Sequence, residues 1–512
     1  MVARYVAELI GALECYGDRP AIGAGKDVLR FSEALDAVYR LAGVLADSGV
    51  GRGAGLACVT GGNRPEALLV RLAAHVLGAR LTPVVGGPAI HGLEFILRDC
   101  RPALVVHDVP VPDTGAPRLG MDGLLSAAAR READEVPVRA RESDIGRVLY
   151  TGGTTGRPKG VASTFGAMAA RDGRRGAGWT ESVYLSVTTL AQRSGGRCLE
   201  QLRAGGRVEI LDPFGPREFA AACRRLGRVS TYLTPPMIYR LLDDPATAGG
   251  IPGLEAVSYG ASPVLPARLR EAVARWGVRW RQGYGTNEAA VICRLTPADH
   301  DAAVAGRPEL LASVGRPVAG VELQVRDGRG GVLPSGHRGE VWVRSETVMA
   351  GYWNQPRLSA EVLREGWLRT GDVGHVGDGG YLYLDDRVKD VVIVDGANIY
   401  CLPVEASLAR HPAVAQAVVV GRPSMLTGEE VCAFLVPAPG CAPSGAAAAE
   451  ASALVERELA PAHRPTVVFW EREIPLTGRG KPDKKRLRER AASAAPDPDL
   501  PPGSVLPPGP GR

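Results

Sequence analysis

A glycine- and threonine-rich stretch is the part of the sequence whose residue types best fit phosphate chemistry. It reads Thr151-Gly-Gly-Thr-Thr-Gly-Arg-Pro-Lys-Gly160 and follows the short apolar segment 147–150. Glycines allow a tight turn that exposes successive backbone N–H groups, and such a concave backbone binds phosphate oxygens. Thr154 and Thr155 add hydroxyl donors, and Lys159 adds positive charge. Taken alone, the stretch is equally compatible with a plain surface turn, because neither Walker A nor GxGxxG spacing is present.

Four further segments continue the pattern along the chain. They are Gly283-Tyr-Gly-Thr-Asn-Glu288, Thr370-Gly-Asp372, Asp386-Arg-Val-Lys-Asp390 with the following Gly396-Ala-Asn-Ile-Tyr400, and Thr477-Gly-Arg-Gly-Lys481. With the 151–160 stretch they resemble, in order, the signatures of the acyl-adenylate-forming superfamily. This superfamily includes acyl- and aryl-CoA ligases, adenylation domains of nonribosomal synthetases, and firefly luciferase. The resemblance spans about residues 20–490, and an ordered set of matches is more specific than any single motif.

The resemblance implies an ATP site in the larger, N-terminal part of the chain. The 151–160 loop would hold the β- and γ-phosphates, with Thr155 and Lys159 acting in catalysis. Glu288, together with Thr155, would bind the Mg2+ that accompanies ATP, since this hard cation prefers oxygen ligands. Asp372 would bind the ribose hydroxyls, and its alternative role is that of an aspartate capping a turn. The other residues implied in nucleotide binding are Thr151, Gly152, Gly153, Thr154, Gly156, Gly260, Ala261, Tyr284, which would pack against adenine, Gly285, Thr286, Asn287 and Arg387.

The resemblance also implies a mobile C-terminal part. Lys481 would contact the attacking carboxylate and the α-phosphate together, and so stabilise the charge of the transition state. Lys389 would be the hinge, and Gly396 would lie in a channel for the incoming thiol. Alternatively, residues 385–390 are only a solvated linker and residues 481–490 only a basic surface helix. That helix is short, carries acidic residues and lacks interleaved aromatics, so nucleic-acid binding is not expected.

The sequence departs from the commonest family pattern at three places. Gly152 replaces a serine, and Asn287 replaces the threonine before Glu288. Where many relatives carry an aromatic and then a histidine near the acyl site, Ala191 and Gln192 stand here. Arg193 and Arg197 follow. They are either surface arginines or, if they point inward, groups that favour a substrate with a second anionic or polar group. The predicted substrate-pocket residues are Gln192, Arg193, Gly196, Arg197, Pro235 and Tyr259.

Hydrophobic periodicity predicts the elements that position these segments. Residues 31–45 and 65–77 have apolar positions at helical spacing, whereas 55–60 and 81–85 are short buried strands. This alternation predicts α/β layers around a largely parallel sheet. From residue 321 the period becomes two, which indicates an antiparallel unit. We therefore predict a large N-terminal multi-layer α/β domain with an antiparallel β subdomain, and a small mobile C-terminal α+β domain.

The predicted boundaries place an adenylation domain at 1–386, a lid domain at 387–492 and a disordered proline-rich tail at 493–512. The Pro-, Gly- and Ala-rich segment 437–449 is expected to be a surface loop. A chain of 512 residues is long enough for two or more domains, and its net charge of +5 gives no reason to invoke nucleic acid or an anionic membrane. No apolar run is long enough to span a membrane.

The dispersed set of nine cysteines fits a reducing cytoplasm, and no zinc motif is present. The expected reaction is ATP- and Mg2+-dependent conversion of a small carboxylic acid to acyl-AMP and pyrophosphate, followed by transfer to a thiol, that of coenzyme A. An aryl acid is preferred over a fatty acid. Alternative acceptors are a carrier-protein thiol or an amine, and an unusual oxyanion is an alternative substrate. A catalytically degenerate nucleotide-binding relative and a homodimer also remain open.

Overall fold

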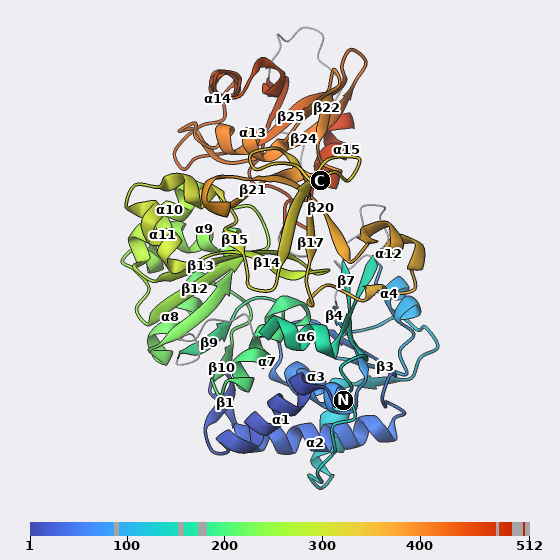
Figure 1. Cartoon of the computed structure of the whole chain (residues 1–512). Helices are drawn as coiled ribbons and strands as arrows, with labels where there is room; N and C mark the ends of the chain where they lie inside the picture. Colours follow the sequence, from blue (N-terminus) through green and yellow to red (C-terminus); the bar gives the residue numbers. More distant parts are fainter. Residues whose placement is uncertain (87–91, 152–157, 173–181, 478–480, 494–504, 507–512) are drawn as a thin grey trace.

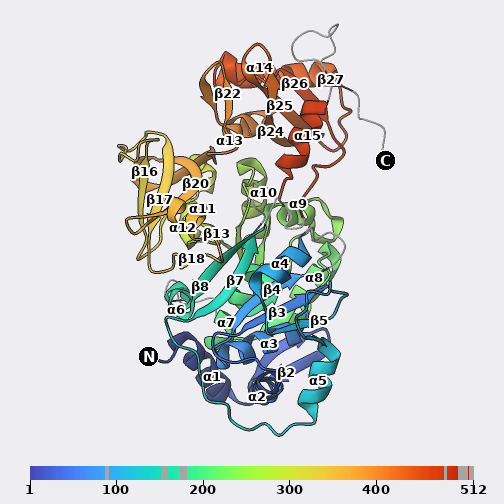
Figure 2. The same cartoon turned by 90° about the vertical axis from the view of Figure 1, so that its right-hand side faces the viewer.

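The computed structural model describes the chain except for residues 87–91, 152–157, 173–181, 478–480, 494–504 and 507–512. The chain folds into a large body, followed by a smaller one that lies above it in Figure 1. Both views show the smaller body standing on one end of the larger one (Figure 2). Strand β21 (Leu382–Arg387) is the last strand of the large body, so the chain crosses to the smaller body immediately after it.

Two largely parallel sheets form the centre of the large body. In the first, nine described strands run in the order β15-β14-β13-β12-β11-β9-β10-β1-β2. The six strands from β13 to β1 in this order pair with one another in parallel, and β14, β15 and β2 add antiparallel pairs at the two edges. Their bounds are β1 Pro20–Ala24, β2 Asp27–Arg30, β9 Val183–Ser186, β10 Val208–Ile210, β11 Val229–Leu233, β12 Leu254–Gly260, β13 Arg279–Thr286, β14 Ala290–Leu295 and β15 Arg316–Pro317.

The second central sheet has seven described strands in the order β18-β8-β7-β4-β3-β5-β6. Strands β3 to β7 pair in parallel, whereas β8 and β18 add antiparallel edges. Their bounds are β3 Gly55–Thr60, β4 Arg80–Val85, β5 Leu104–His107, β6 Arg118–Gly120, β7 Ile145–Thr151, β8 Lys159–Thr164 and β18 Gly351–Tyr352.

Helices cover both faces of these sheets and fill the layer between them. The central layer packs one buried apolar core against β1, β3, β4 and β10. Its helices are α1 Arg4–Tyr16, α2 Phe31–Asp47, α3 Pro65–Val76, α5 Met121–Ala129, α6 Phe165–Asp172 and α7 Gly195–Arg203. The outer layers contain α4 Leu93–Cys100, α8 Pro216–Leu226, α9 Pro235–Asp243, α10 Pro266–Trp276 and α11 Pro297–Val304. Five of these helices begin with proline, whose fixed φ suits the first helical position.

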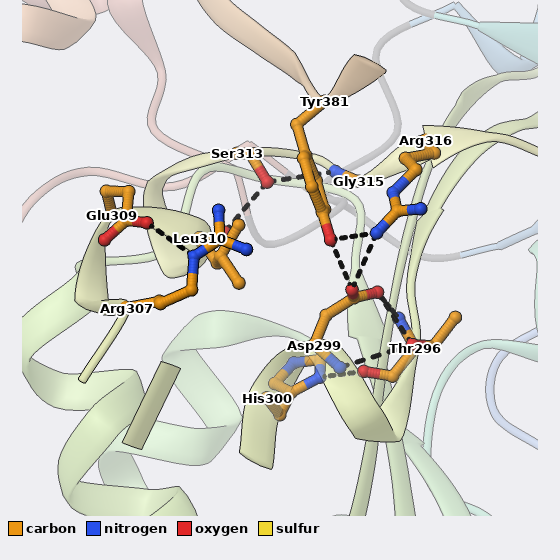
Figure 3. Close-up of polar contacts among 10 residues, drawn as sticks. All are labelled: Thr296, Asp299, His300, Arg307, Glu309, Leu310, Ser313, Gly315, Arg316 and Tyr381. Carbon is orange, nitrogen blue, oxygen red and sulfur yellow. Dashed lines mark hydrogen bonds and ion pairs between the residues drawn. The ribbon is translucent and has the colours of Figure 1, made fainter. Parts of the chain in front are cut away.

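An antiparallel unit completes the large body. Its described strands are β16 Glu322–Arg326, β17 Gly339–Arg344, β19 Leu363–Arg364, β20 Trp367–Val376 and β21, and α12 (Pro356–Val362) lies beside it. A polar network, buried at Asp299 and Tyr381, holds this unit against the first central sheet (Figure 3). In it Tyr381 Oη donates to Asp299 Oδ1 at 2.6 Å, and Arg316 Nη2 lies 3.6 Å from the same oxygen. Thr296 and Asp299 form a capping box that starts α11.

The smaller body has its own apolar cores and a sheet with six described strands. The strands are β22 Val392–Val394, β23 Ala397–Ile399, β24 Val414–Ser424, β25 Gly428–Pro437, β26 Val467–Trp470 and β27 Val505–Leu506. Its helices are α13 Cys401–Leu408, α14 Gly445–Glu458 and α15 Lys484–Ser493. The predicted fold class is confirmed: a layered α/β body with an antiparallel subdomain is followed by a small α+β unit.

Two sequence expectations differ from the structure. The segment 437–449 is not wholly a loop, since α14 begins at Gly445 behind an N-cap at Ser444, whose Oγ accepts from Ala447 N–H at 3.1 Å. In the proline-rich tail, β27 pairs with β26 in parallel, so residues 505 and 506 are ordered into the sheet. The rest of the tail after Ser493 lies outside the described residues. None of the described helices has the length and apolar character that a membrane crossing requires.

Candidate active site

Near the end of β13, which faces β20 and β21, the side chains of Tyr284, Asp372 and Arg387 meet. Tyr284 Oη donates to Asp372 Oδ2 at 2.6 Å, and Arg387 Nε lies 3.0 Å from the other oxygen, Oδ1. Burial, followed by the Asp372 charge, raises the pKa of Tyr284 well above its usual value, so its hydroxyl stays a donor. The Asp372 charge, in turn, raises the pKa of Arg387. Three residues from distant motifs thus form one charged, hydrogen-bonded group.

The backbone around this group requires small residues. Gly260 has φ 151°, and a Cβ added there would lie 2.4 Å from the carbonyl oxygen of Gly283. A Cβ at Gly285 would lie 1.7 Å from the carbonyl oxygen of Ala290. Ala261 adopts φ 72°, a left-handed conformation that costs a non-glycine residue about 1 kcal/mol. These close approaches explain the glycines at the end of β12 (Gly260) and near the end of β13 (Gly285), beside the Tyr284 group.

The predicted phosphate loop closes a hairpin. Thr151 ends β7, Lys159 begins β8, and the two residues are paired in the antiparallel register. Gly152, Gly153, Thr154, Thr155 and Gly156 lie outside the described residues. The hairpin brings the flanks of the loop to the edge of the second sheet, next to β18.

Glu288 is joined to this edge through a residue that the sequence did not point to, Tyr352 of β18. Tyr352 Oη donates to Glu288 Oε1 at 3.0 Å, and the Lys159 ammonium nitrogen lies 5.5 Å from the centroid of the Tyr352 ring. Burial and the neighbouring Glu288 charge raise the pKa of Tyr352. Tyr352 therefore links the predicted metal ligand to the lysine of the phosphate loop. Its pairing with Val161 across β8 and β18 was not visible in any motif.

Replacing Tyr352 with phenylalanine removes one hydrogen bond to the Glu288 carboxylate and keeps the ring near Lys159. Hydrogen bonds to charged groups contribute about 1.5 kcal/mol or more, which corresponds to roughly a tenfold effect. We expect the KM for MgATP to rise about tenfold in steady-state assays. Tyr383→Phe, at a half-buried tyrosine of β21 stacked on His375, is the matched control. An unchanged KM for MgATP in Tyr352→Phe would show that this contact does not support the site.

The three residues predicted for the mobile part lie in the smaller body or at its entrance. Lys481 stands in a tight loop before α15: its N–H donates to Thr477 Oγ1 at 3.3 Å, and its carbonyl oxygen accepts from Thr477 N–H at 2.7 Å. Among the described contacts, none joins Lys481 to Glu288 or Asp372. Lys389 is exposed and lies just after β21, with its ammonium nitrogen 3.9 Å from Asp390 Oδ1.

Gly396 forms, with Asp395, the two-residue turn between β22 and β23. Both residues have positive φ, 50° for Asp395 and 78° for Gly396, as a type I′ turn requires. Gly396 is exposed, so the tip of this hairpin is open to solvent.

A cavity of about 160 Å³ opens beside the Gly283–Asn287 segment and runs between β11–β13 and α7. Gly283, Thr286 and Asn287 line it at the nucleotide motif, and Arg193, Gly196 and Arg197 line it farther along. Both arginines therefore face the cavity. Arg193 Nη2 donates to the carbonyl oxygens of Thr286 at 2.8 Å and Ala290 at 3.3 Å, which ties the helical segment to the motif.

The other three predicted pocket residues do not line this cavity. Side chains alternate along β12, so Ser258 faces the cavity and Tyr259 faces the opposite side. There Tyr259 Oη is hydrogen bonded to His300 Nε2 at 2.9 Å in an apolar core. Pro235 is buried at the first turn of α9. Gln192 lies inside a π-helical turn, Leu190–Ser194, with non-helical backbone angles, so the place where the sequence departs from the family pattern is also irregular in structure.

Comparison with known proteins agrees with this geometry. Residues 11–353 match the family described as AMP-binding enzyme, and residues 403–481 match the AMP-binding enzyme C-terminal domain. The chain belongs to the AMP-binding enzyme family. The predicted resemblance is thereby confirmed: this is an AMP-forming, adenylate-forming ligase. The first matched region lies within the large body and the second within the small body.

Relatives within the family differ in substrate. A medium/long-chain-fatty-acid–CoA ligase, FadD8, of Mycobacterium tuberculosis (strain ATCC 25618 / H37Rv) is 32% identical over 94% of this chain and 89% of its own. A feruloyl-CoA synthase of Amycolatopsis sp is 30% identical over 92% of this chain and 95% of its own. The solved structure of the amide bond synthetase McbA from Marinactinospora thermotolerans superposes with a TM-score of 0.84 at 33% identity, covering 96% of this chain and all of that one.

Proposed function

We propose that this AMP-binding enzyme activates a small carboxylic acid as its acyl-adenylate and then transfers the acyl group to the thiol of coenzyme A. The observation that carries the proposal is that residues from four of the five sequence motifs meet at one end of the large body. Tyr284, Asp372 and Arg387 form one group there, and Glu288 is linked to Lys159 through Tyr352.

Each group has a task in holding ATP. Asp372 is oriented by Tyr284 and Arg387, so its oxygens are fixed and can accept the ribose hydroxyls. The loop between Thr151 and Lys159 would bind the β- and γ-phosphates through backbone N–H groups and hydroxyls, including that of Thr155. Tyr284 is buried beside the same carboxylate, where its ring can support the adenine.

The residues present also fit a magnesium ion that enters with ATP. Glu288 offers a carboxylate of which one oxygen is engaged by Tyr352, and the other accepts no hydrogen bond from a described residue. The described residues contain no cluster of three or more His, Cys, Asp or Glu side chains suited to a metal. A site with one protein carboxylate is what Mg2+ prefers, because it keeps water and substrate phosphate oxygens as its other ligands. Bound there, the ion would neutralise phosphate charge.

The chemistry needs no general base, since a carboxylate is ionised and nucleophilic at pH 7. A carboxylate oxygen attacks the α-phosphorus, the new P–O bond forms, and the bond to the bridging oxygen breaks as pyrophosphate leaves. Lys481 would stabilise the charge on the α-phosphate oxygens. In this structure, no contact among the described residues joins Lys481 to Asp372 or Glu288. Rotation of the smaller body about Lys389 would bring it in, and a further rotation would bring the Gly396 hairpin to the thiol channel.

Different observations support the proposed substrate and the proposed acceptor. A cavity of about 160 Å³ fits a ring or a short chain, as the likeness to the feruloyl-CoA synthase also favours, better than a long acyl chain. A second candidate acceptor is an amine, favoured by the similarity to the amide bond synthetase over nearly the whole chain. In both cases the acyl-adenylate comes first, and the acceptor displaces AMP from the acyl carbon.

Acid-dependent exchange between pyrophosphate and ATP tests the proposal. Aryl, fatty and amino acids are screened, and each active acid is then followed to product with coenzyme A or with a simple amine. We expect exchange with at least one acid class, and thioester formation with coenzyme A. Tight ATP binding without exchange for any acid would contradict the proposal, and amide without thioester would favour the second acceptor.

A further inference from the structure

The cavity beside the nucleotide motif has an unusual charge. Among its described lining residues are seven arginines and a single acidic residue, Glu200. Two of the arginines, Arg193 and Arg197, belong to the segment in which the sequence departs from its family. The others come from elements far apart in the chain, so the concentration of positive charge arises only when the domain folds.

The innermost arginines lie deep in the central layer. Arg71 of α3 is 3% exposed and Arg147 of β7 is 5% exposed. No described carboxylate lies within ion-pair distance of either guanidinium. Arg71 Nη1 is 3.5 Å from the carbonyl oxygen of Leu190, but its Nε and Nη2, like Arg147 Nε, have no hydrogen-bond partner among the described residues. His75 is fully buried one turn along α3 from Arg71, and neither of its ring nitrogens has a hydrogen-bond partner among the described residues.

The outer arginines approach from α7 and the turn before it. Arg193 is held by the carbonyl oxygens of Thr286 and Ala290. The Arg197 guanidinium lies 4.2 Å from the centroid of the Tyr232 ring, which fixes it without neutralising its charge. Neither of these arginines forms an ion pair with a described carboxylate. The cavity is thus lined with guanidinium groups from its nucleotide end to its depth.

Such an arrangement is unfavourable in the empty protein. An arginine stays protonated even when buried, and each buried, unpaired charge costs several kcal/mol. The pKa of Arg147 is lowered by burial and then by the positive charges of Arg171 and Arg71, which shows that its charged form is destabilised in this cavity. An anion inside the cavity would offset the repulsion and supply the missing hydrogen-bond acceptors. The reacting carboxylate itself must stay at the Gly283–Asn287 end, near the α-phosphate, so the anion deeper inside is a different group.

We propose that the acid activated by this enzyme carries a second anionic group, which the arginines of the cavity bind while the first carboxylate reacts. The inference rests on the proposed function and names its substrate class. The second group is a carboxylate, sulfonate or phosphate on a skeleton small enough for a cavity of about 160 Å³, such as one ring or a short chain. Guanidinium groups bind such oxyanions through paired, charge-assisted hydrogen bonds.

Matched acids test the substrate class. Benzoate is compared with isophthalate and 3-sulfobenzoate, and octanoate with octanedioate, in the pyrophosphate exchange assay. Two charge-assisted contacts predict that kcat/KM is about 100-fold higher for at least one dianionic acid than for its monoanionic partner. The sulfonate and carboxylate arms then identify the second group. Equal or faster exchange with the monoanionic acids would overturn the inference while leaving the proposed function in place.

Charge-removing variants test the residues. We expect Arg147→Met and Arg197→Met each to reduce kcat/KM for the preferred dianionic acid at least about tenfold, mainly through KM. Arg147→Met should also melt no lower than the wild type in the absence of substrate, because it removes an unpaired buried charge. Arg224→Met, on the exposed face of α8, is the control. If Arg147→Met fails to fold, Arg197→Met, at a half-buried position, still tests the binding role.

Binding without catalysis separates the two proposals. Isophthalate and 3-sulfobenzoate are expected to raise the Tm of the wild type, and not that of Arg197→Met, with ATP absent. If no acid supports exchange but this shift appears, the proposed function fails and the anion site stands. Without any shift in the wild type, or with a full shift in Arg197→Met, the anion site is contradicted.

Discussion

Replacing Lys481 with alanine is expected to lower acid-dependent pyrophosphate exchange by about 100- to 1,000-fold. The ammonium would stabilise charge that grows on the α-phosphate oxygens only in the transition state, and losing one such group typically costs about 3–4 kcal/mol of activation free energy. Lys481 stands in a surface loop before α15, so the variant should keep the wild-type Tm. The effect should therefore appear in kcat of the exchange reaction and hardly in the KM for ATP.

Two neighbouring lysines make this prediction specific. Lys485 is exposed, and its one ion pair among the described residues is an i,i+4 pair with Glu489, so Lys485→Ala should leave both exchange and stability unchanged. Lys484 is different: its Nζ lies 2.9 Å from Glu405 Oε1 in a buried pair. Lys484→Ala should lower the free energy of unfolding by about 3 kcal/mol, because Glu405 is left buried without its partner. If Lys481→Ala retained wild-type exchange, the assignment of the lysine would be wrong.

The second large effect is expected at Asp372. Alanine there removes both the ribose acceptor and the charge that holds Tyr284 and Arg387 together. We expect kcat/KM for ATP to fall at least about 100-fold, since two charge-assisted contacts of roughly 1.5 kcal/mol or more are lost at once. The buried Tyr284 hydroxyl would then lose its Asp372 acceptor, so the variant should also melt at a lower temperature.

Conservative changes separate these two consequences. Asp372→Asn keeps the shape and a hydrogen-bond acceptor for Tyr284 but loses the charge, so we expect an intermediate loss. Asp378→Ala, at an exposed position after the same strand, is the matched control and should behave as the wild type. If Asp372→Ala kept wild-type kinetics for ATP, Asp372 would not be the residue that binds the ribose.

Much of the fold could be predicted because each element carries its own periodicity. The helical spacing of residues 31–45 correctly predicted α2, and the buried apolar run 55–60 correctly predicted β3. The change to period two after residue 321 correctly indicated the antiparallel unit. Alanines and a serine N-cap at 444 were a helix signal within 437–449, but the prolines and glycines of that segment obscured it.

The site was harder to predict where its residues belong to no sequence motif and come together only in the folded protein. Tyr352 lies about sixty residues from Glu288 in the sequence, and only the pairing of β18 with β8 brings the two together. Successive side chains of a strand point to opposite faces. Because Ser258 of β12 faces the cavity, its neighbour Tyr259 cannot line it. Arg71 and Arg147 carry no local signal at all, because their meeting depends on how α3 packs against the second sheet.

Transfer of labelled oxygen tests the central claim most directly. The preferred acid is prepared with 18O in both carboxylate oxygens and is converted with ATP and coenzyme A in a single turnover. Attack by the carboxylate on the α-phosphorus predicts AMP that contains one 18O, with none in pyrophosphate. Label in pyrophosphate or orthophosphate, or AMP without label, would contradict the formation of an acyl-adenylate by this enzyme.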